Sequence, residues 1–191
     1  MKIPFFGGQK KGFSKNQNAQ ETVNMFLELD SSETDTNISL IRVDGKKLFL
    51  NLPTVPILSM LEFRGILYVV TQTQLYKVLF DGSYTALGSV NCDIRTTMTA
   101  NNVGEIMIVC GVLGYVLNTN TDTLTQVTNP AFYGSPRVDY LDGYGVLVRP
   151  NSQQFYISAY NDFLTFDGLE FATNGSDPDN LVTGIVDHRE L

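Results

Sequence analysis

The stretch GEIMIVCGVLGYVLN, residues 104–118, decides the fold. It holds two short runs rich in Ile, Val and Leu, and a glycine precedes each of them, which is typical of β-strands joined by tight turns. Residues 106–110 are apolar at every position instead of alternating with polar residues. A strand with that pattern is covered on both faces. The stretch therefore predicts a strand pair sandwiched between two other sheets.

The same pattern recurs along the chain at a spacing of 40 residues. The repeated segments open with a polar residue or glycine and continue with large apolar residues, at 74–78, 114–118 and 154–158. Glycine-led apolar runs precede them at 65–70, 104–109 and 145–148, and shorter segments come earlier still at 57–62, 94–99 and 137–141. A last segment follows at 84–90, 124–128 and, less distinctly, 167–171. Each copy thus reads as four short strands.

Four strands in roughly 40 to 45 residues is the blade unit of a β-propeller. The sequence predicts an all-β, propeller-type architecture with about three four-stranded blades plus the start of a fourth at residues 181–186. A β-sandwich built from evenly spaced hairpins is the alternative. Because propellers close with about four to eight blades, we expect this chain to be the front part of a longer protein, or to be completed by other copies.

Two regions differ in pattern. Residues 1–50 are predicted to form an extended leader with a basic arm and strands at 23–29, 38–43 and 48–50, and residues 51–191 the blades. The leader strands would suit pairing with the last blade of a full ring. The arm, residues 1–16, contains Lys2, Lys10, Lys11 and Lys15 and no acidic residue. A basic arm therefore precedes an acidic body.

The net charge is −7, from 13 Lys and Arg against 20 Asp and Glu, which is the wrong sign for a protein that grips a phosphate backbone. The longest apolar run, residues 106–113, is far shorter than the roughly 20 residues that a membrane-spanning helix needs. We expect neither sequence-specific DNA binding nor membrane insertion.

Several short segments of the sequence point to a protein family. The segments FYISA (155–159), ND (161–162), FD (166–167), LEFA (169–172), PD (178–179) and HREL (188–191) resemble the packaged-DNA stabilisation or tail-hub proteins of short-tailed phages and prophages. At the front, VNMFLE (23–28) is similar to the family's leader and GILYVV (65–70) to its first blade. The resemblance covers most of the chain.

The resemblance implies a non-enzymatic virion component that is made in the cytoplasm of the bacterial host. Such a protein forms a homo-oligomeric ring below the portal and adaptor, carries the tail spike or fibre and the needle, and closes the DNA exit channel after packaging. An acidic channel wall suits that role, because it lets DNA pass without sticking. The residues expected at assembly or channel-facing positions are Lys10, Lys11, Lys15, Arg95 and Arg137. Lys10, Lys11 and Lys15 would dock on a neighbouring acidic subunit, or would belong to a solvated terminus.

A glycan-binding or glycan-hydrolysing propeller is the rival hypothesis. Arg95 and Arg137 begin the first strands of copies two and three, so both would lie near the central channel, where arginines can bind a sugar carboxylate. Salt links to Asp93 and Asp139 are the plainer interpretation. The candidate carboxylates Glu62, Glu105, Asp139 and Glu170 occupy unlike positions in their repeats, so no hydrolytic pair emerges.

No other chemistry is indicated, and we expect no cofactor, no metal and no catalytic residue. The sequence has no phosphate-binding loop and no calcium-loop pattern. Its single histidine, His188, leaves no base for a nucleophilic triad elsewhere in the chain. Cys92 and Cys110, 18 positions apart, are interpreted as free thiols, with Cys110 filling the core.

Overall fold

The computed structural model describes residues 25–30, 37–42, 45, 47–92 and 96–173. The chain divides into two compact units, Met1–Phe49 and Leu50–Leu191. In the first unit, β1 (Met25–Asp30) and β2 (Asn37–Arg42) form a two-stranded antiparallel sheet in which Leu27 lies opposite Leu40. Two of the three predicted leader strands, 23–29 and 38–43, therefore exist within two residues of their expected bounds.

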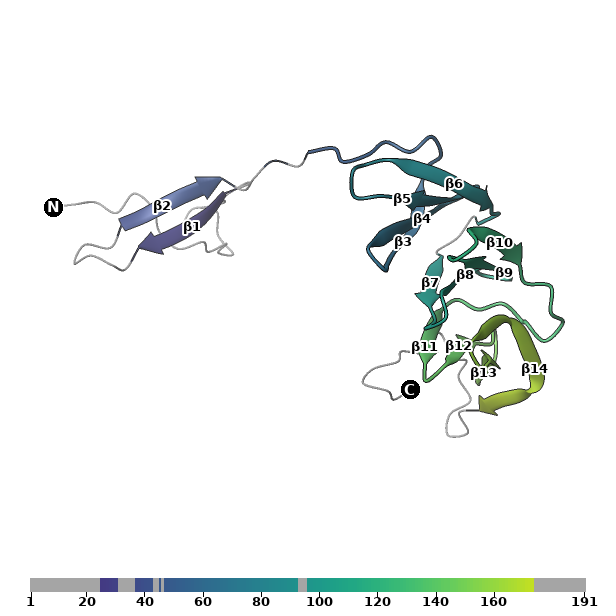
Figure 1. The fold of residues 1–191 in the computed structure, drawn as a ribbon. Helices are drawn as coiled ribbons and strands as arrows, with labels where there is room; N and C mark the ends of the chain where they lie inside the picture. Colours follow the sequence, from purple (N-terminus) through teal and green to yellow (C-terminus); the bar gives the residue numbers. More distant parts are fainter. Residues whose placement is uncertain (1–24, 31–36, 43–44, 46, 93–95, 174–191) are drawn as a thin grey trace. The chain divides into compact units, whose positions relative to one another are not determined.

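The second unit contains three four-stranded antiparallel sheets, and the described part of the chain contains no helix. Within each sheet the strands neighbour one another in chain order, and the three sheets follow one another as Figure 1 shows. Blade 1 consists of β3 (Ile57–Phe63), β4 (Ile66–Thr71), β5 (Gln74–Val78) and β6 (Tyr84–Ser89). Blade 2 consists of β7 (Thr97–Ala100), β8 (Glu105–Cys110), β9 (Leu113–Asn118) and β10 (Thr123–Gln126). Blade 3 consists of β11 (Val138–Leu141), β12 (Tyr144–Val148), β13 (Gln154–Ala159) and β14 (Asp162–Thr173).

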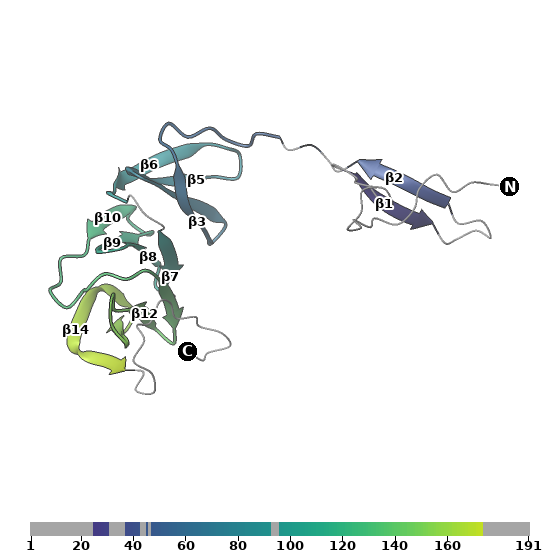
Figure 2. The same ribbon diagram turned by 180° about the vertical axis from the view of Figure 1, so that it is seen from behind.

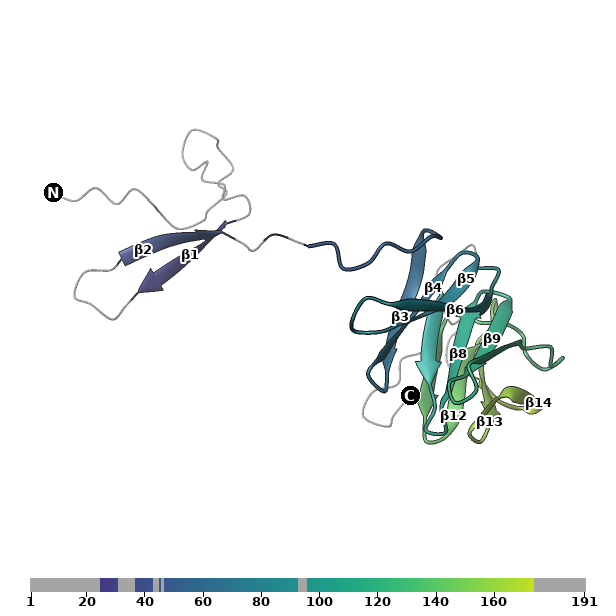
Figure 3. The same cartoon turned by 45° about the horizontal axis from the view of Figure 1, so that its top comes forward.

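The predicted repeat is confirmed. Each sheet is built from four consecutive strands and none exchanges a strand with another, which excludes the β-sandwich alternative. The sheets stack face to face with their middle strands side by side, as seen in Figure 3. The three described blades do not close a ring, so the architecture is an incomplete propeller. The predicted first strand of a fourth blade, residues 181–186, lies outside the described residues.

The core lies between the blades, and β8 shows how the sequence builds it. Ile106 and Ile108 belong to the buried cluster shared with blade 1, whereas Met107 and Val109 belong to the cluster shared with blade 3. Successive residues of a strand point to opposite faces of the sheet. Both faces of blade 2 are buried, so residues 106–109 of β8 must all be apolar, and all four are fully buried.

A short segment of the chain covers the outer face of blade 1. In this strap, defined as residues 50–54, the side chains of Leu50 and Leu52 pack against Val69, Tyr76 and Val78 of β4 and β5. The Thr54 hydroxyl forms hydrogen bonds with Thr71 Oγ1 at 2.7 Å and with the Tyr76 hydroxyl at 2.9 Å. The prediction of a strand at 48–50 is therefore wrong, because Leu50 packs onto a sheet face without pairing to a strand edge.

The prediction of free thiols is also wrong. Cys92 and Cys110 form a disulfide that joins the connection between blades 1 and 2 to the end of β8. Their Cα atoms lie 5.4 Å apart, within the usual range for a disulfide. Cys92 comes after the last strand of blade 1 and Cys110 ends the second strand of blade 2. Stacking of consecutive blades brings these two positions together.

The connection between blades 2 and 3 is fastened at Gly134. The φ angle of Gly134 is +77°, the Ser135 N–H donates to the Gly111 carbonyl oxygen at 2.8 Å, and the Tyr156 hydroxyl donates to the Gly134 carbonyl oxygen at 2.8 Å. A Cβ atom at position 134 would meet the Gly111 carbonyl oxygen at 2.5 Å. Glycine is therefore required here for both conformation and space.

We predict that Gly134→Ala destabilises the protein more than Gly65→Ala. Both glycines have a positive φ, but nothing lies within 4 Å of a Cβ atom at Gly65. Gly65→Ala should cost about 1–2 kcal/mol of unfolding free energy from conformation alone. Gly134→Ala should add about 1–3 kcal/mol of steric strain. Chemical denaturation of both variants tests this, and equal losses would contradict the proposed contact.

A second prediction concerns alkaline pH. Burial raises the pKa of the Tyr156 phenol above its ordinary value, so the folded state favours the neutral form. The stability from this group is therefore present below the unfolded-state pKa of about 10 and is lost as pH rises through the folded pKa. Tyr156→Phe should cost about 1–3 kcal/mol at neutral pH, because it leaves the Gly134 carbonyl oxygen without its donor.

Above pH 10, the Tyr156→Phe variant should lose unfolding free energy less steeply than the wild type. Tyr160→Phe is the matched control, because Tyr160 is 65% exposed and its removal should change neither the neutral-pH stability nor the slope. The measurement is unfolding free energy by denaturant titration from pH 7 to 11. Parallel curves for the wild type and Tyr156→Phe would contradict the assignment.

Candidate functional site

The first strands of the three blades line a central groove. Strands β3, β7 and β11 are neighbours, and Figure 2 shows β3 and β7 following one another along the same side of the blades. The groove has a volume of about 300 Å³ and is lined by Leu58, Ser59, Thr96, Thr97, Met98, Arg137, Val138 and Asp139. Hydroxyl groups, one arginine and one carboxylate give it a polar surface, with a few apolar side chains between them.

Hydrogen bonds hold the start of β11 in place. The Val138 N–H donates to Thr97 Oγ1 at 3.1 Å and so links β11 to β7 of the preceding blade. The Ser135 hydroxyl donates to the Arg137 carbonyl oxygen, and it accepts the Arg137 N–H at 3.2 Å and the Val148 N–H at 3.0 Å. These hydrogen bonds fix the backbone from which the Arg137 side chain extends.

The charge of Arg137 is balanced inside the groove. Its Nε donates to Asp139 Oδ2 at 3.0 Å, with the two side chains 34% and 29% exposed. These two are the only charged residues that line the described groove. The described lining of the groove consequently carries no net charge. The interpretation of Arg137 as part of a salt link to Asp139 is confirmed.

The other predicted site residues lie outside the described part of the chain. This applies to Arg95 and to the basic-arm residues Lys10, Lys11 and Lys15. The glycan hypothesis gains no support from the described residues. Arg137 is already paired, and Glu105 Oε2 accepts hydrogen bonds from Asn101 Nδ2 at 2.9 Å and from the Phe163 N–H at 3.1 Å. Glu105 thus ties blade 2 to blade 3.

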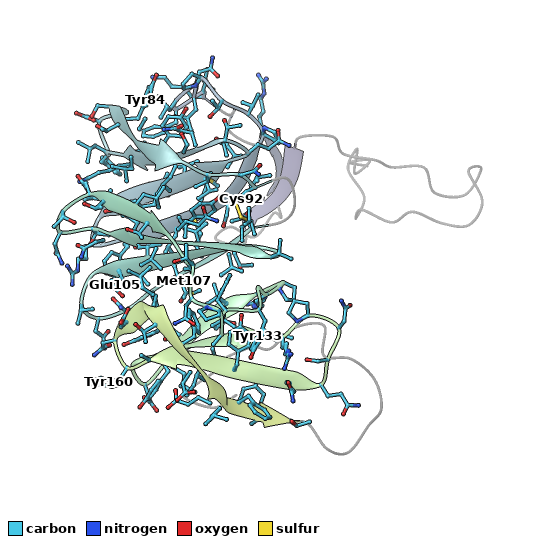
Figure 4. All side chains as sticks on the ribbon, turned by 90° about the vertical axis from the view of Figure 1, so that its right-hand side faces the viewer. Tyr84, Cys92, Glu105, Met107, Tyr133 and Tyr160 are labelled. Atoms are coloured by element: carbon cyan, nitrogen blue, oxygen red, sulfur yellow. A yellow bond between two sulfur atoms is a disulfide. The ribbon has the colours of Figure 1, made fainter. Side chains whose placement is uncertain are left out.

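A second surface, not predicted from the sequence, lies at one end of the blades. In Figure 4, Glu105 and Tyr160 lie at this end, whereas Cys92 and Tyr133 lie at the other. The turns that leave the first and third strands of each blade meet here. We name this surface the acidic rim; its exposed members are the acids Glu62, Asp81, Asp122 and Asp142 and the apolar tips Phe80, Val103 and Tyr160.

The basic residues near the acidic rim are already engaged. Lys77 Nζ lies 2.8 Å from Asp122 Oδ2 and thereby links blade 1 to blade 2, and its hydrogen bond to Asp122 raises the pKa of the Lys77 amine. Arg64 Nη2 donates to the Asn102 carbonyl oxygen at 3.1 Å. Asp81 accepts from the Ser83 hydroxyl, which lowers the pKa of its carboxyl. The rim remains negative, with Phe80 96% exposed at its edge.

The described residues offer no group of three or more His, Cys, Asp or Glu that could hold a metal ion. In the same part of the chain, no helix has the length and apolar character needed to cross a membrane. The site therefore consists of two surfaces, a neutral polar groove and a negative rim with apolar tips. Both are surfaces on which the described residues can contact other molecules.

Comparison with known proteins identifies the chain. Its sequence matches, over residues 1–191, a phage stabilisation family described as bacteriophage P22 Gp10, a β-propeller. The chain belongs to this family. Gp10-family proteins are structural phage proteins that stabilise packaged DNA, and the family description agrees with the blades described above. No curated protein matches the sequence significantly.

Several solved structures are similar to this Gp10-family chain at low sequence identity. The WD40 domain of Neurospora crassa Pan2 is 13% identical, with 62% of this chain and 36% of that chain covered and a TM-score of 0.44. The computationally designed Ika4 protein is 9% identical (71% and 84% covered, TM-score 0.46). YCF48 from Cyanidioschyzon merolae is 12% identical (78% and 52% covered, TM-score 0.44). The chain thus spans about a third of the Pan2 chain and half of the YCF48 chain.

We predict that Asp139→Asn gives the groove of this Gp10-family chain a measurable affinity for polyanions. Removing the carboxylate leaves the Arg137 charge unbalanced, and one added phosphate contact changes the salt-dependence slope of DNA binding by about 0.9. The loss of unfolding free energy should stay below about 1 kcal/mol, because the pair is partly exposed. Elution from a heparin column should require more salt than for the wild type.

Asp142→Asn is the matched control for this experiment. It removes the same charge from the β11–β12 turn, outside the groove, where Asp142 has a positive φ that asparagine also tolerates. Elution of this variant should stay close to that of the wild type. An equal shift in both variants would show that net charge, and not the groove, controls polyanion binding.

Proposed function

We propose that this chain is a non-enzymatic part of the phage tail that closes the portal channel, retains the packaged DNA and anchors other tail proteins. The observation that carries the proposal is the match to the Gp10 family over residues 1–191. In this proposal the protein resides in the virion tail, assembles as a homo-oligomeric ring, and is made in the cytoplasm of the bacterial host. Its partners are the portal or adaptor, the spike or fibre, and the needle.

The two surfaces support the proposal in different ways. The groove carries no net charge, because Arg137 is paired with Asp139 at 3.0 Å, and the described acidic rim is negative. Surfaces of this kind do not bind the phosphate backbone tightly, so DNA can be retained by a physical barrier and released later. The exposed apolar tips Phe80, Val103 and Tyr160 have the character of protein–protein contact residues.

The proposed domain arrangement is the one predicted from the sequence. Residues 1–50 form a leader and residues 51–191 hold blades 1–3 and the first strand of a fourth. The leader sheet, β1 with β2, would pair with the last blade of the full ring, since an isolated two-stranded sheet is marginally stable in water. Lys10, Lys11 and Lys15 would dock on an acidic neighbour, and Arg95 would join Arg137 near the propeller axis.

The function is tested in particles. We predict that phage particles assembled without this gene product fill with DNA and then lose it, so that the amount of DNase-resistant DNA per particle falls severalfold. Complementation with the wild-type gene should restore it. The variant Phe80→Ser with Tyr160→Ser should restore less, because it removes two apolar tips of the acidic rim without touching the blade core.

Val112→Ser is the matched control, since Val112 is also exposed but lies in the β8–β9 turn at the opposite end of blade 2. It should complement as well as the wild type. Full DNA retention in the absence of the gene product would overturn the proposal. Turnover of any sialoside or glycoside that Arg137→Ala abolishes would favour the glycan-processing rival.

A further inference from the structure

The disulfide lies between two blades and not within one. Cys92 belongs to the connection that leaves β6, and Cys110 is the last residue of β8. The two residues are 1% and 4% exposed and sit in the buried cluster that also contains Ile108 and Leu75. Figure 4 shows the sulfur atoms between the sheets of blades 1 and 2. The bond is therefore a covalent clamp inside a blade interface.

The clamp is not needed to bring the two sulfur atoms together. The Val90 N–H donates to the Thr73 carbonyl oxygen at 3.0 Å, and the Cys92 N–H donates to the Gln72 carbonyl oxygen at 2.9 Å. The Asn91 N–H between them donates to the Tyr115 hydroxyl of blade 2 at 3.0 Å. These three hydrogen bonds fix the connection on both blades and hold Cys92 beside Cys110 without the bond.

The same pocket accommodates the reduced form. Cys110 Sγ lies 3.7 Å from the Asn91 carbonyl oxygen, a distance at which a thiol donates a weak hydrogen bond. Buried thiols otherwise pack as small apolar groups, and the surrounding cluster is apolar. In the reduced form the Cys110 thiol would have this acceptor, and the Cys92 thiol would pack as a small apolar group in the cluster.

We propose that Cys92 and Cys110 form a reversible redox clamp between blades 1 and 2, a dithiol during synthesis and a disulfide in the released virion. The order of the two states rests on the proposed function. Bacterial cytoplasm keeps thiols reduced, whereas disulfides persist outside the cell. A virion protein passes from the first environment to the second. The chain would assemble with blades 1 and 2 held by noncovalent contacts alone and be locked covalently afterwards.

The oxidation proceeds by exchange with a low-molecular-weight disulfide such as oxidised glutathione. One cysteine thiolate attacks a sulfur of that disulfide, forms a mixed disulfide and expels one thiolate. The second cysteine thiolate then attacks the mixed disulfide, forms the Cys92–Cys110 bond and expels the other. Two electrons pass from the cysteines to the reagent, whose two expelled thiolates take up the two protons that the cysteines lose.

The clamp acts on the groove through β7. Cys92 and Cys110 are separated by 18 residues, and the loop that they close contains all of β7, the innermost strand of blade 2. Closing a loop of this size restricts the unfolded chain and the hairpin within it. Oxidation should therefore stabilise the lining of the groove at Thr97 and Met98.

The test compares the oxidised and reduced wild-type full chain, so no variant has to fold. Protein purified with reductant is incubated with oxidised and reduced glutathione. Free thiols are then alkylated with N-ethylmaleimide, and the mass of the chain is measured by mass spectrometry. We expect two alkylated cysteines before oxidation, none after it, and a thermal midpoint roughly 5–10 °C higher in the oxidised protein. Because both sulfur atoms are buried, exchange should require minutes or more and should speed up in mild denaturant.

Two controls separate the clamp from general effects of the reagent. Cys92→Ala and Cys110→Ala should each fold and show the same midpoint in reducing and oxidising buffer. A wild-type midpoint that does not respond to oxidation, or cysteines that never lose alkylation, would overturn the proposal whatever the function of the protein. Alkylating the chain in infected cells and in released particles tests whether the dithiol precedes the disulfide. Thiols in the cells and a disulfide in the particles would support the switch. Thiols in both samples would overturn it.

Discussion

The structure depends on one constraint, that each sheet has two apolar faces and each face must be covered. Blade 2 meets it by packing Ile106 and Ile108 against blade 1 and Met107 and Val109 against blade 3. A β-strand that is apolar at every position cannot exist at the surface of a protein in water. The run at residues 106–110 therefore requires a stack of at least three sheets, and the repeat provides the neighbours.

The constraint also acts at the end of the stack. No sheet among the described residues covers the outer face of blade 1, yet Val69, Tyr76 and Val78 are buried there. The strap solves the problem with Leu50, Leu52 and the Thr54 hydroxyl. Terminal units of repeat proteins need caps of this kind, because their outer faces lack the neighbour that inner units have.

The sequence predicted the strands, because they follow from a repeating residue pattern. It did not predict the contacts that depend on how neighbouring blades are oriented. The 40-residue repeat predicted eleven of the twelve blade strands within three residues of their observed bounds, whereas the segment expected at 167–171 is part of the longer β14, Asp162–Thr173. The Cys92–Cys110 disulfide and the Lys77–Asp122 ion pair each join different blades. Both contacts form only because a particular turn of one blade faces a particular turn of the next. The residue pattern along the chain does not show how one blade is rotated relative to its neighbour. The strand expected at 48–50 did not form, and its last residue, Leu50, belongs to the strap that packs on the face of blade 1.

The contacts between blades explain why the fold suits a scaffold. Apolar clusters form a broad interface that tolerates small rotations, because dispersion and hydrophobic burial are not directional. Polar links such as Thr97 to Val138 and Glu105 to Phe163 fix the orientation at single points. In the groove, Thr97 links blade 2 to blade 3 and Arg137 is paired with Asp139. Broad apolar contacts and single polar links together hold consecutive blades in one fixed arrangement, as a structural protein of the Gp10 family requires.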